Sequence, residues 1–326
     1  MICMIEKIMP DLYLIKVPIP NNPLKVTNSY IIKGKGNNLI IDTGLNLKES
    51  LNAILSGLKK IDVDLKKTDF FITHLHSDHL DLALALATNS SKIYFNHPEA
   101  EFIGRSNEWD SELYNIAKVC GFPENRLQEI IKKYSWHRYR KVDPDIFTIL
   151  KEGDIIDVGD FHLKCKETKG HSKGHICLYE SGKKMLFAGD HILSDITPNI
   201  SLFSYENNPL KDYLISLDKV YKLDIELVLP GHRSFIRDCR KRIDELKLHH
   251  KMRTNEILSI LGQGRKDAFQ IASKMSWEMT YDSWESFAIN HKFFATLEAI
   301  AHLKYLEEDG FIQKETQGQK ILFSLR

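Results

Sequence analysis

The stretch Thr73-His74-Leu75-His76-Ser77-Asp78-His79 decides how this chain is interpreted, because it concentrates four side chains that can bind metal. The preceding run Asp69-Phe-Phe-Ile-Thr73 predicts a buried strand, and Leu80 to Ala87 predicts a helix. Imidazole and carboxylate groups at this spacing suit borderline divalent metals. With 14 His in 326 residues, a chance His-x-His-x-Asp-His arises in about one sequence per thousand. The motif therefore predicts a metal site where a strand ends.

Three further residues of ligand type occur in the same kind of place. His171, Asp190 and His232 each come shortly after an apolar run that predicts a strand. Open sheets gather their sites beyond the ends of their strands. We therefore expect one site built from His74, His76, Asp78, His79, His171, Asp190 and His232.

This ordered set resembles the metallo-β-lactamase superfamily of dinuclear metallohydrolases, over roughly residues 5–240. Asp42-Thr43-Gly44 matches the superfamily's Asp-x-Gly turn, and Leu186 to Asp190 matches the strand that carries its bridging carboxylate. The resemblance implies an α+β fold, an αββα sandwich in which two sheets lie face to face with helices outside. The complete His-x-His-x-Asp-His set is the pattern of the glyoxalase II, lactonase and ribonuclease branches rather than of secreted antibiotic lactamases.

The resemblance also implies how two divalent ions would share the ligands. The first ion would be held by His74, His76 and His171. The second would be held by Asp78, His79 and His232, and Asp190 would bridge both ions. Two ions can share a hydroxide and stabilise both the attacking and the leaving oxygen. Asp78 is the expected catalytic residue, because it could orient that hydroxide or pass its proton to the leaving group.

Two residues are expected beside the ligands rather than among them. Asp42 and His175 would orient ligands through hydrogen bonds, and the alternative for both is local stabilisation of a turn. Zinc is the expected metal of a His-rich site, with iron or manganese as alternatives for a site bridged by Asp. The sequence identifies no substrate-binding residue.

Composition excludes several classes of protein. The chain has 45 Lys and Arg against 44 Asp and Glu, so its formal charge is +1, and 43% of its residues are hydrophobic. These values fit a globular protein and exclude a disordered or fibrous one. The start of the chain indicates no signal peptide, no apolar run is long enough to span a bilayer, and the five cysteines form no C-x-x-C pair. We therefore expect a cytoplasmic protein with reduced cysteines and no membrane partner.

The residue patterns predict two domains. Residues 1–240 would form the catalytic domain, with a helical insertion at about 98–150 that includes an aromatic and basic stretch at 136–141. Residues 241–326 would form a winged-helix-like domain, since three helical segments precede two short strands around Gly318. This order resembles a superfamily branch with a C-terminal winged helix, whose animal members are endoribonucleases.

We expect hydrolysis of a small ester, thioester or lactone, so the expected partner is a small-molecule substrate. The alternative is cleavage of RNA. Residues 233–274 contain eleven basic and five acidic side chains, a local charge of 11 − 5 = +6 that could bind phosphates. The same charges would also fit a solvated helix face or a homodimer contact. A third hypothesis is a metal-binding sensor without catalysis, against which the complete ligand set argues.

Overall fold

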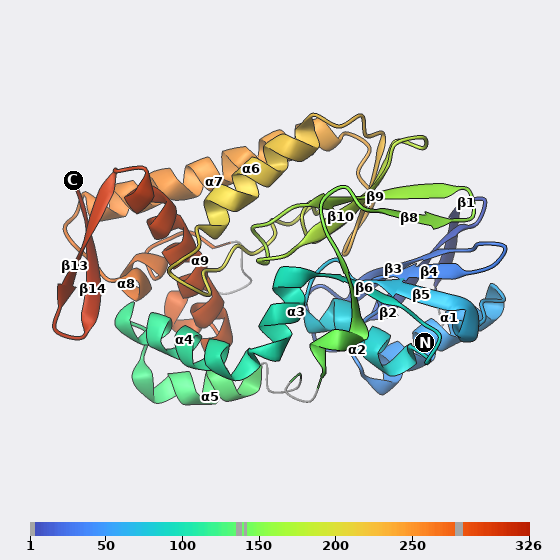
Figure 1. Cartoon of the computed structure of the whole chain (residues 1–326). Coiled ribbons are helices and arrows are strands. Elements are labelled where there is room, and N and C mark those ends of the chain that lie inside the picture. Colours follow the sequence, from blue (N-terminus) through green and yellow to red (C-terminus); the bar gives the residue numbers. More distant parts are fainter. Residues whose placement is uncertain (1–3, 135–138, 140–141, 278–282) are drawn as a thin grey trace. The chain divides into compact units, whose positions relative to one another are not determined.

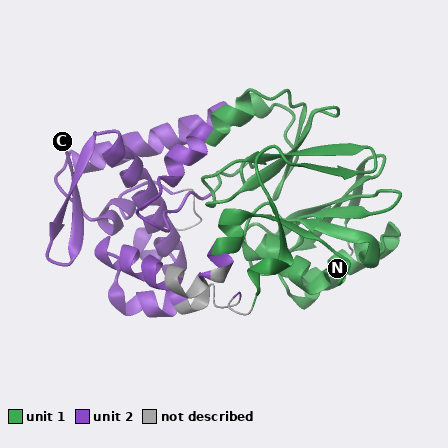
Figure 2. Cartoon of the chain, viewed as in Figure 1, with its two compact units in different colours: residues 1–101, 142–198, 216–243 green, residues 102–141, 199–215, 244–326 purple. Residues whose placement is uncertain are grey.

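The structure is a computed structural model that describes residues 4–134, 139, 142–277 and 283–326. These residues form two compact units, coloured separately in Figure 2. Unit 1 comprises residues 1–101, 142–198 and 216–243, and unit 2 comprises residues 102–141, 199–215 and 244–326. Most of the predicted insertion thus shares a unit with the C-terminal region, whereas the sequence places a boundary at residue 240.

The first sheet of unit 1 follows chain order (Figure 1). Its strands are β1 (Ile5–Met9), β2 (Leu12–Pro18), β3 (Val26–Ile32), β4 (Asn38–Ile41), β5 (Thr68–Phe71), β6 (Ile93–Asn96) and β7 (Phe147–Leu150). Strands β1 to β4 pair antiparallel, and β4 to β7 pair parallel. Parallel neighbours require crossovers, and the first two are made by helices α1 (Lys48–Lys60) and α2 (Ser77–Leu86). The parallel strands all end at the edge where the His-rich motif begins.

The second sheet of unit 1 has the order β12-β11-β10-β9-β8. Its strands are β8 (Ile155–Val158), β9 (Phe161–Glu167), β10 (Ile176–Glu180), β11 (Met185–Gly189) and β12 (Leu227–Pro230). Along β9, buried Phe161, Leu163 and Cys165 alternate with exposed residues, as expected for a strand with one buried face. These side chains join Leu14 and Phe71 of the first sheet in one hydrophobic core.

Helices cover the outer faces, which completes the sandwich implied by the resemblance. Gly57 of α1 lies so close to β2 that an added Cβ would stand 2.5 Å from the Ile15 side chain. Beside the second sheet, Ser216 of α6 (Pro209–Tyr221) donates to the Lys169 carbonyl at 2.8 Å. The predicted mixed sheet sandwich is confirmed.

Unit 2 is built from helices and a hairpin. Its elements include α3 (His97–Gly104) in its later part, α4 (Ser106–Val119), α5 (Glu124–Tyr134), α7 (Cys239–Leu261) from Asp244 onward, α8 (Ala268–Ala272), α9 (Ile289–Glu308), β13 (Ile312–Gln317) and β14 (Lys320–Leu325). Phe122 packs edge-on against Phe269 and Phe293, at 5.5 and 5.4 Å between ring centroids. These contacts tie the predicted insertion to the C-terminal helices. The order of three helices and a hairpin is the predicted one, and the winged-helix assignment itself stays a prediction.

Three elements differ from the sequence-based expectation. The sequence does not predict β1, because an edge strand with Glu6 and Lys7 shows no apolar run. Strand β7 lies within the stretch 98–150 that the sequence assigns to helices. Helix α2 begins at Ser77 rather than Leu80, so its first turn contains Asp78. Short 3₁₀ helices are η1 (Leu65–Lys67), η3 (Pro144–Ile146) and η4 (Trp284–Ser286).

Three further sequence-based expectations can be compared with the structure only within the described residues. The cysteines at 120, 165, 177 and 239 are buried and free of disulfides, while Cys3 lies outside the described residues. Residues 136–138 and 140–141 of the aromatic and basic stretch also lie outside them. Among the helices of the described ranges, none combines the length and the apolar character needed to cross a bilayer.

Adjacent isoleucines on β8 allow a matched test of the core. Ile156 is 5% exposed within the core between the sheets, whereas Ile155 is 59% exposed. We expect Ile156→Ala to lower the free energy of unfolding by about 2–5 kcal/mol, because it leaves a cavity. Ile155→Ala should change it by no more than about 0.5 kcal/mol. Urea titrations followed by circular dichroism measure both, and equal losses would contradict the assigned register of β8.

Candidate metal centre

The seven predicted ligands lie together in unit 1. They lie beyond the ends of β5, β9, β11 and β12 and in the first turn of α2, and five of them are buried: His74, His79, His171, Asp190 and His232. His76 and Asp78 are partly exposed. Each sits next to a strand end because parallel strands, and the strands of the facing sheet, direct their following loops to one edge.

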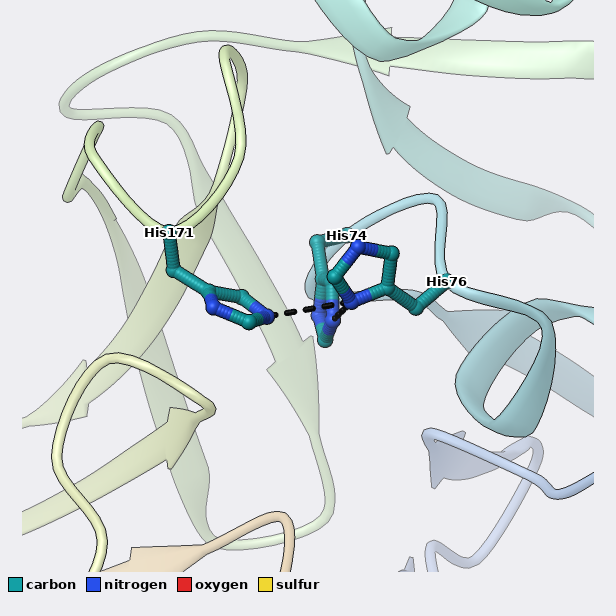
Figure 3. Close-up of side chains that lie close together, drawn as sticks. All are labelled: His74, His76 and His171. Atoms are coloured by element: carbon teal, nitrogen blue, oxygen red, sulfur yellow. Dashed lines mark hydrogen bonds between the residues drawn. The ribbon is translucent and has the colours of Figure 1, made fainter. Parts of the chain in front are cut away.

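Three imidazoles form a first group, shown in Figure 3. The Nδ1 atom of His76 lies 2.9 Å from His74 Nε2 and 3.0 Å from His171 Nε2. The three rings meet edge to face, with centroids 4.5 to 4.9 Å apart. Their nitrogens therefore converge on one point that can hold a metal ion. We call His74, His76 and His171 the first triad.

A second group combines one carboxylate with two imidazoles. The Nε2 atom of His232 lies 3.3 Å from Asp78 Oδ2 and 3.3 Å from His79 Nε2. The Nε2 atom of His79 lies 3.9 Å from Asp78 Oδ2. These atoms also lie within reach of a single ion. We call Asp78, His79 and His232 the second triad.

Asp190 lies between the two triads. Its Oδ2 atom is 3.7 Å from His171 Nε2 in the first triad and 3.5 Å from His232 Nε2 in the second. Its Oδ1 atom is 3.6 Å from His79 Nε2, and His74, His79 and Asp190 form a further group that could hold an ion. The arrangement fits a dinuclear site, and the role of each ligand stays a prediction.

The donor set itself fits divalent metal ions. Asp190 Oδ1 is buried and has no hydrogen-bond partner among the described residues. A buried carboxylate oxygen without a partner costs free energy unless a cation neutralises it. Imidazole and carboxylate donors suit zinc, iron and manganese alike, so the set does not select one metal.

Burial keeps two imidazoles of the first triad, those of His74 and His76, neutral. It lowers the pKa of His74 well below the usual value, and the neighbouring imidazoles His79 and His76 lower that pKa further. Burial and then His171 lower the pKa of His76 to about 3. Both rings are therefore deprotonated at neutral pH and can offer lone pairs to a cation.

Nearby carboxylates determine the pKa values of the two imidazoles in the second triad. Burial would lower the pKa of His79, but Asp42, Asp190 and Asp78 outweigh it and raise this pKa to about 9. Burial likewise opposes charge on His232, yet Asp190 and Asp78 raise its pKa well above the usual value. The pKa of Asp78 is lowered because His79 and His232 overcome its burial. Protons on these imidazoles balance the carboxylates here, and a bound cation would take their place.

Hydrogen bonds fix which nitrogen of each ring faces the site. The Nδ1 atom of His79 lies 2.8 Å from Asp42 Oδ2, and that of His232 lies 2.8 Å from the Val26 carbonyl. The Nδ1 atom of His74 lies 2.9 Å from the Thr73 hydroxyl. With Nδ1 engaged as a donor, Nε2 of each ring is free to bind metal.

Asp42 and His175 lie where the sequence expects them, beside the ligands. Asp42 adopts a left-handed backbone with φ of 55° and accepts hydrogen bonds from the Thr73 amide and hydroxyl, both at 2.9 Å. Aspartate tolerates this conformation better than most residues. His175 Nε2 accepts from the Asp190 amide at 3.2 Å, and its Nδ1 lies 2.8 Å from the Thr168 hydroxyl. Their roles stay predictions.

Several residues that contribute to the site are not predicted from the sequence. Thr73 links Asp42 to His74, and its place directly before the motif is a signal that could have suggested it. Gly231 lets the His232 loop approach closely, because an added Cβ would lie 2.6 Å from Asp190 Oδ1. The Val26 carbonyl leaves no signal in a sequence, since every residue has one. Glu99, which is fully buried beside the first triad, lies in the stretch that the sequence assigns to the insertion.

Known proteins share this fold and match along the chain. The family described as the Metallo-beta-lactamase superfamily matches residues 22–232. The probable metallo-hydrolase YqjP of Bacillus subtilis is 26% identical, over 96% of this chain and 97% of its own. The human acyl-coenzyme A thioesterase MBLAC2 is 29% identical, over 63% of this chain and 72% of its own.

Among solved structures, the metallo-beta-lactamase family protein TTHA1429 of Thermus thermophilus superposes with a TM-score of 0.81 at 27% identity, covering 98% of this chain and 100% of its own. The prediction that the chain is a hydrolase of the metallo-beta-lactamase superfamily is confirmed. The match spans more than half of the sequence and includes every predicted ligand. The chain therefore belongs to the metallo-beta-lactamase superfamily.

Proposed function

We propose that this protein is a dinuclear metal-dependent hydrolase whose substrate is a small acyl thioester. The observation that carries the proposal is the pair of triads with Asp190 between them. The similarity to an acyl-coenzyme A thioesterase favours thioesters among the expected ester, thioester and lactone substrates. The +6 charge of residues 233–274 fits a solvated helix face or a homodimer contact as well as RNA, so it does not favour RNA over a thioester.

Two divalent ions held by the triads would lower the pKa of water and polarise the scissile carbonyl. Hydrolysis adds water to the carbonyl carbon, breaks the carbon–sulfur bond and delivers a proton to the departing sulfur. We assign that proton to Asp78, because its side chain is 18% exposed and its lowered pKa keeps it ionised at neutral pH. Its Oδ2 atom could accept a proton from water and release it to the leaving group.

The metal content tests the assignment of ligands. We expect the wild-type protein to bind two zinc equivalents, and His171→Ala and His232→Ala to bind one each, because each removes a ligand from a different triad. Equilibrium dialysis followed by elemental analysis measures the content. Less than one equivalent in the wild-type protein, after supply of zinc, iron or manganese, would contradict the assignment.

Substitutions beside and within the cluster should differ in effect. Asp190→Asn should disturb both triads and remove nearly all hydrolysis, because Asp190 faces ligands of each. His175→Ala removes an acceptor for the Asp190 amide and a partner of the Thr168 hydroxyl, but no predicted ligand, and should reduce activity by about 10–100-fold. Steady-state kinetics of the zinc-loaded proteins compare them, and an equal loss in both variants would contradict the division into ligands and residues that support them.

The substrate class is tested with a panel. We expect zinc-loaded protein to release thiol from a short acyl-coenzyme A, detected with a thiol reagent, and to lose this activity on chelation. Matched esters and lactones should react more slowly. A bis-aryl phosphodiester, a single-stranded RNA and a β-lactam complete the panel. Metal-dependent cleavage of the RNA without thioester hydrolysis would overturn the proposal and favour the ribonuclease hypothesis.

A further inference from the structure

Glu99 is a fully buried carboxylate that the proposed chemistry does not use. It lies in the first turn of α3, within unit 1. Its Oε1 atom accepts hydrogen bonds from the Ser172 hydroxyl and the Gly174 amide, both at 2.6 Å. Its Oε2 atom accepts from the Leu75 amide at 3.3 Å. One carboxylate thus binds three donors.

These donors belong to the two loops that carry the first triad. Leu75 stands between His74 and His76, and Ser172 directly follows His171. A carboxylate that binds both loops fixes the distance between the imidazoles of His74 and His76, on one loop, and the imidazole of His171, on the other. The distances at Ser172 and Gly174 are short for a hydroxyl and an amide donor, so both groups lie close against the carboxylate.

Glu99 packs tightly against the loop that carries His171. A Cβ added to Gly174 would lie 2.8 Å from Glu99 Cγ and 3.1 Å from its amide nitrogen, so the His171 loop can approach this closely only with glycine there. Burying a carboxylate is costly unless its oxygens are satisfied. The carboxylate is buried at a position where two of its three partners, Leu75 and Ser172, are adjacent to predicted ligands.

We propose that Glu99 is a positioning residue that aligns the first triad, so that the metal affinity of this triad depends on it. The inference rests on the ligand assignment of the proposed function. Glu99 touches neither substrate nor metal in this account, and it acts only through the loops of His74, His76 and His171.

The test isolates each triad with a ligand substitution. His232→Ala leaves the first triad complete, and His171→Ala leaves the second complete. Glu99→Gln keeps the shape of the side chain, but its amide nitrogen cannot accept the Leu75 hydrogen bond. In the His232→Ala background we expect Glu99→Gln to weaken zinc binding about 10–100-fold, measured by competition with a chromophoric chelator. In the His171→Ala background, zinc affinity should stay close to its starting value.

Glu180→Gln is the matched control. Glu180 is also a buried carboxylate that accepts backbone amides, from His162 and from Gly182, but it lies at the far end of β10 from the His175 loop. Glu180→Gln should leave the zinc affinity unchanged in both the His232→Ala and the His171→Ala background. Ser172→Ala removes one donor to Glu99 and should weaken zinc binding in the same direction, by less, which keeps the proposal testable if Glu99→Gln does not fold.

Two results would overturn the proposal, and they are distinguishable. If the His232→Ala protein binds zinc but Glu99→Gln and Ser172→Ala leave its affinity unchanged, Glu99 only stabilises the fold. If the His232→Ala protein binds no zinc at all, the ligand assignment is wrong and the proposed role of Glu99 is wrong with it. Cobalt absorption spectra that shift with Glu99→Gln, and not with Glu180→Gln, would support the proposal independently of affinity.

Discussion

The candidate centre depends on one constraint, which is that five imidazoles and two carboxylates must stay within a few ångströms of one another and mostly out of water. Such a set is stable only if its charges balance. In the absence of metal, protons on His79 and His232 offset Asp78 and Asp190, as the raised pKa values of these imidazoles indicate. In the first triad, burial and neighbouring imidazoles lower the pKa values of His74 and His76, so these two rings stay neutral. Divalent cations would bind the neutral imidazoles of His74 and His76 and would replace the protons of His79 and His232.

The two-sheet sandwich holds the predicted ligands close together. Its core holds both sheets together, so the loops after β5, β9, β11 and β12 start from fixed points. Hydrogen bonds from Asp42, Thr73 and the Val26 carbonyl then orient individual rings. Rigid strands thus set the coarse positions of the ligands, and hydrogen bonds from neighbouring residues set their orientation, the combination that a preorganised site requires.

The sequence revealed most of the fold and the composition of the cluster, because both leave local patterns. Apolar runs that end in His or Asp predict strands and ligands together, and the structure brings all seven predicted ligands into one place. What the sequence could not show depends on contacts distant along the chain. Strand β1 has no apolar run, β7 lies inside a largely helical stretch, and Glu99 meets Ser172 and Gly174 only after folding. The packing of Phe122 against Phe293 likewise joins segments that the sequence assigns to different domains.

Metal-edge anomalous diffraction from crystals of the zinc-loaded protein tests the dinuclear centre most directly. We expect two anomalous peaks about 3.5–4 Å apart, one contacting His74, His76 and His171, the other contacting Asp78, His79 and His232. Asp190 should lie between the two peaks. A single peak, or peaks that these residues do not contact, would contradict a dinuclear centre built from the two triads.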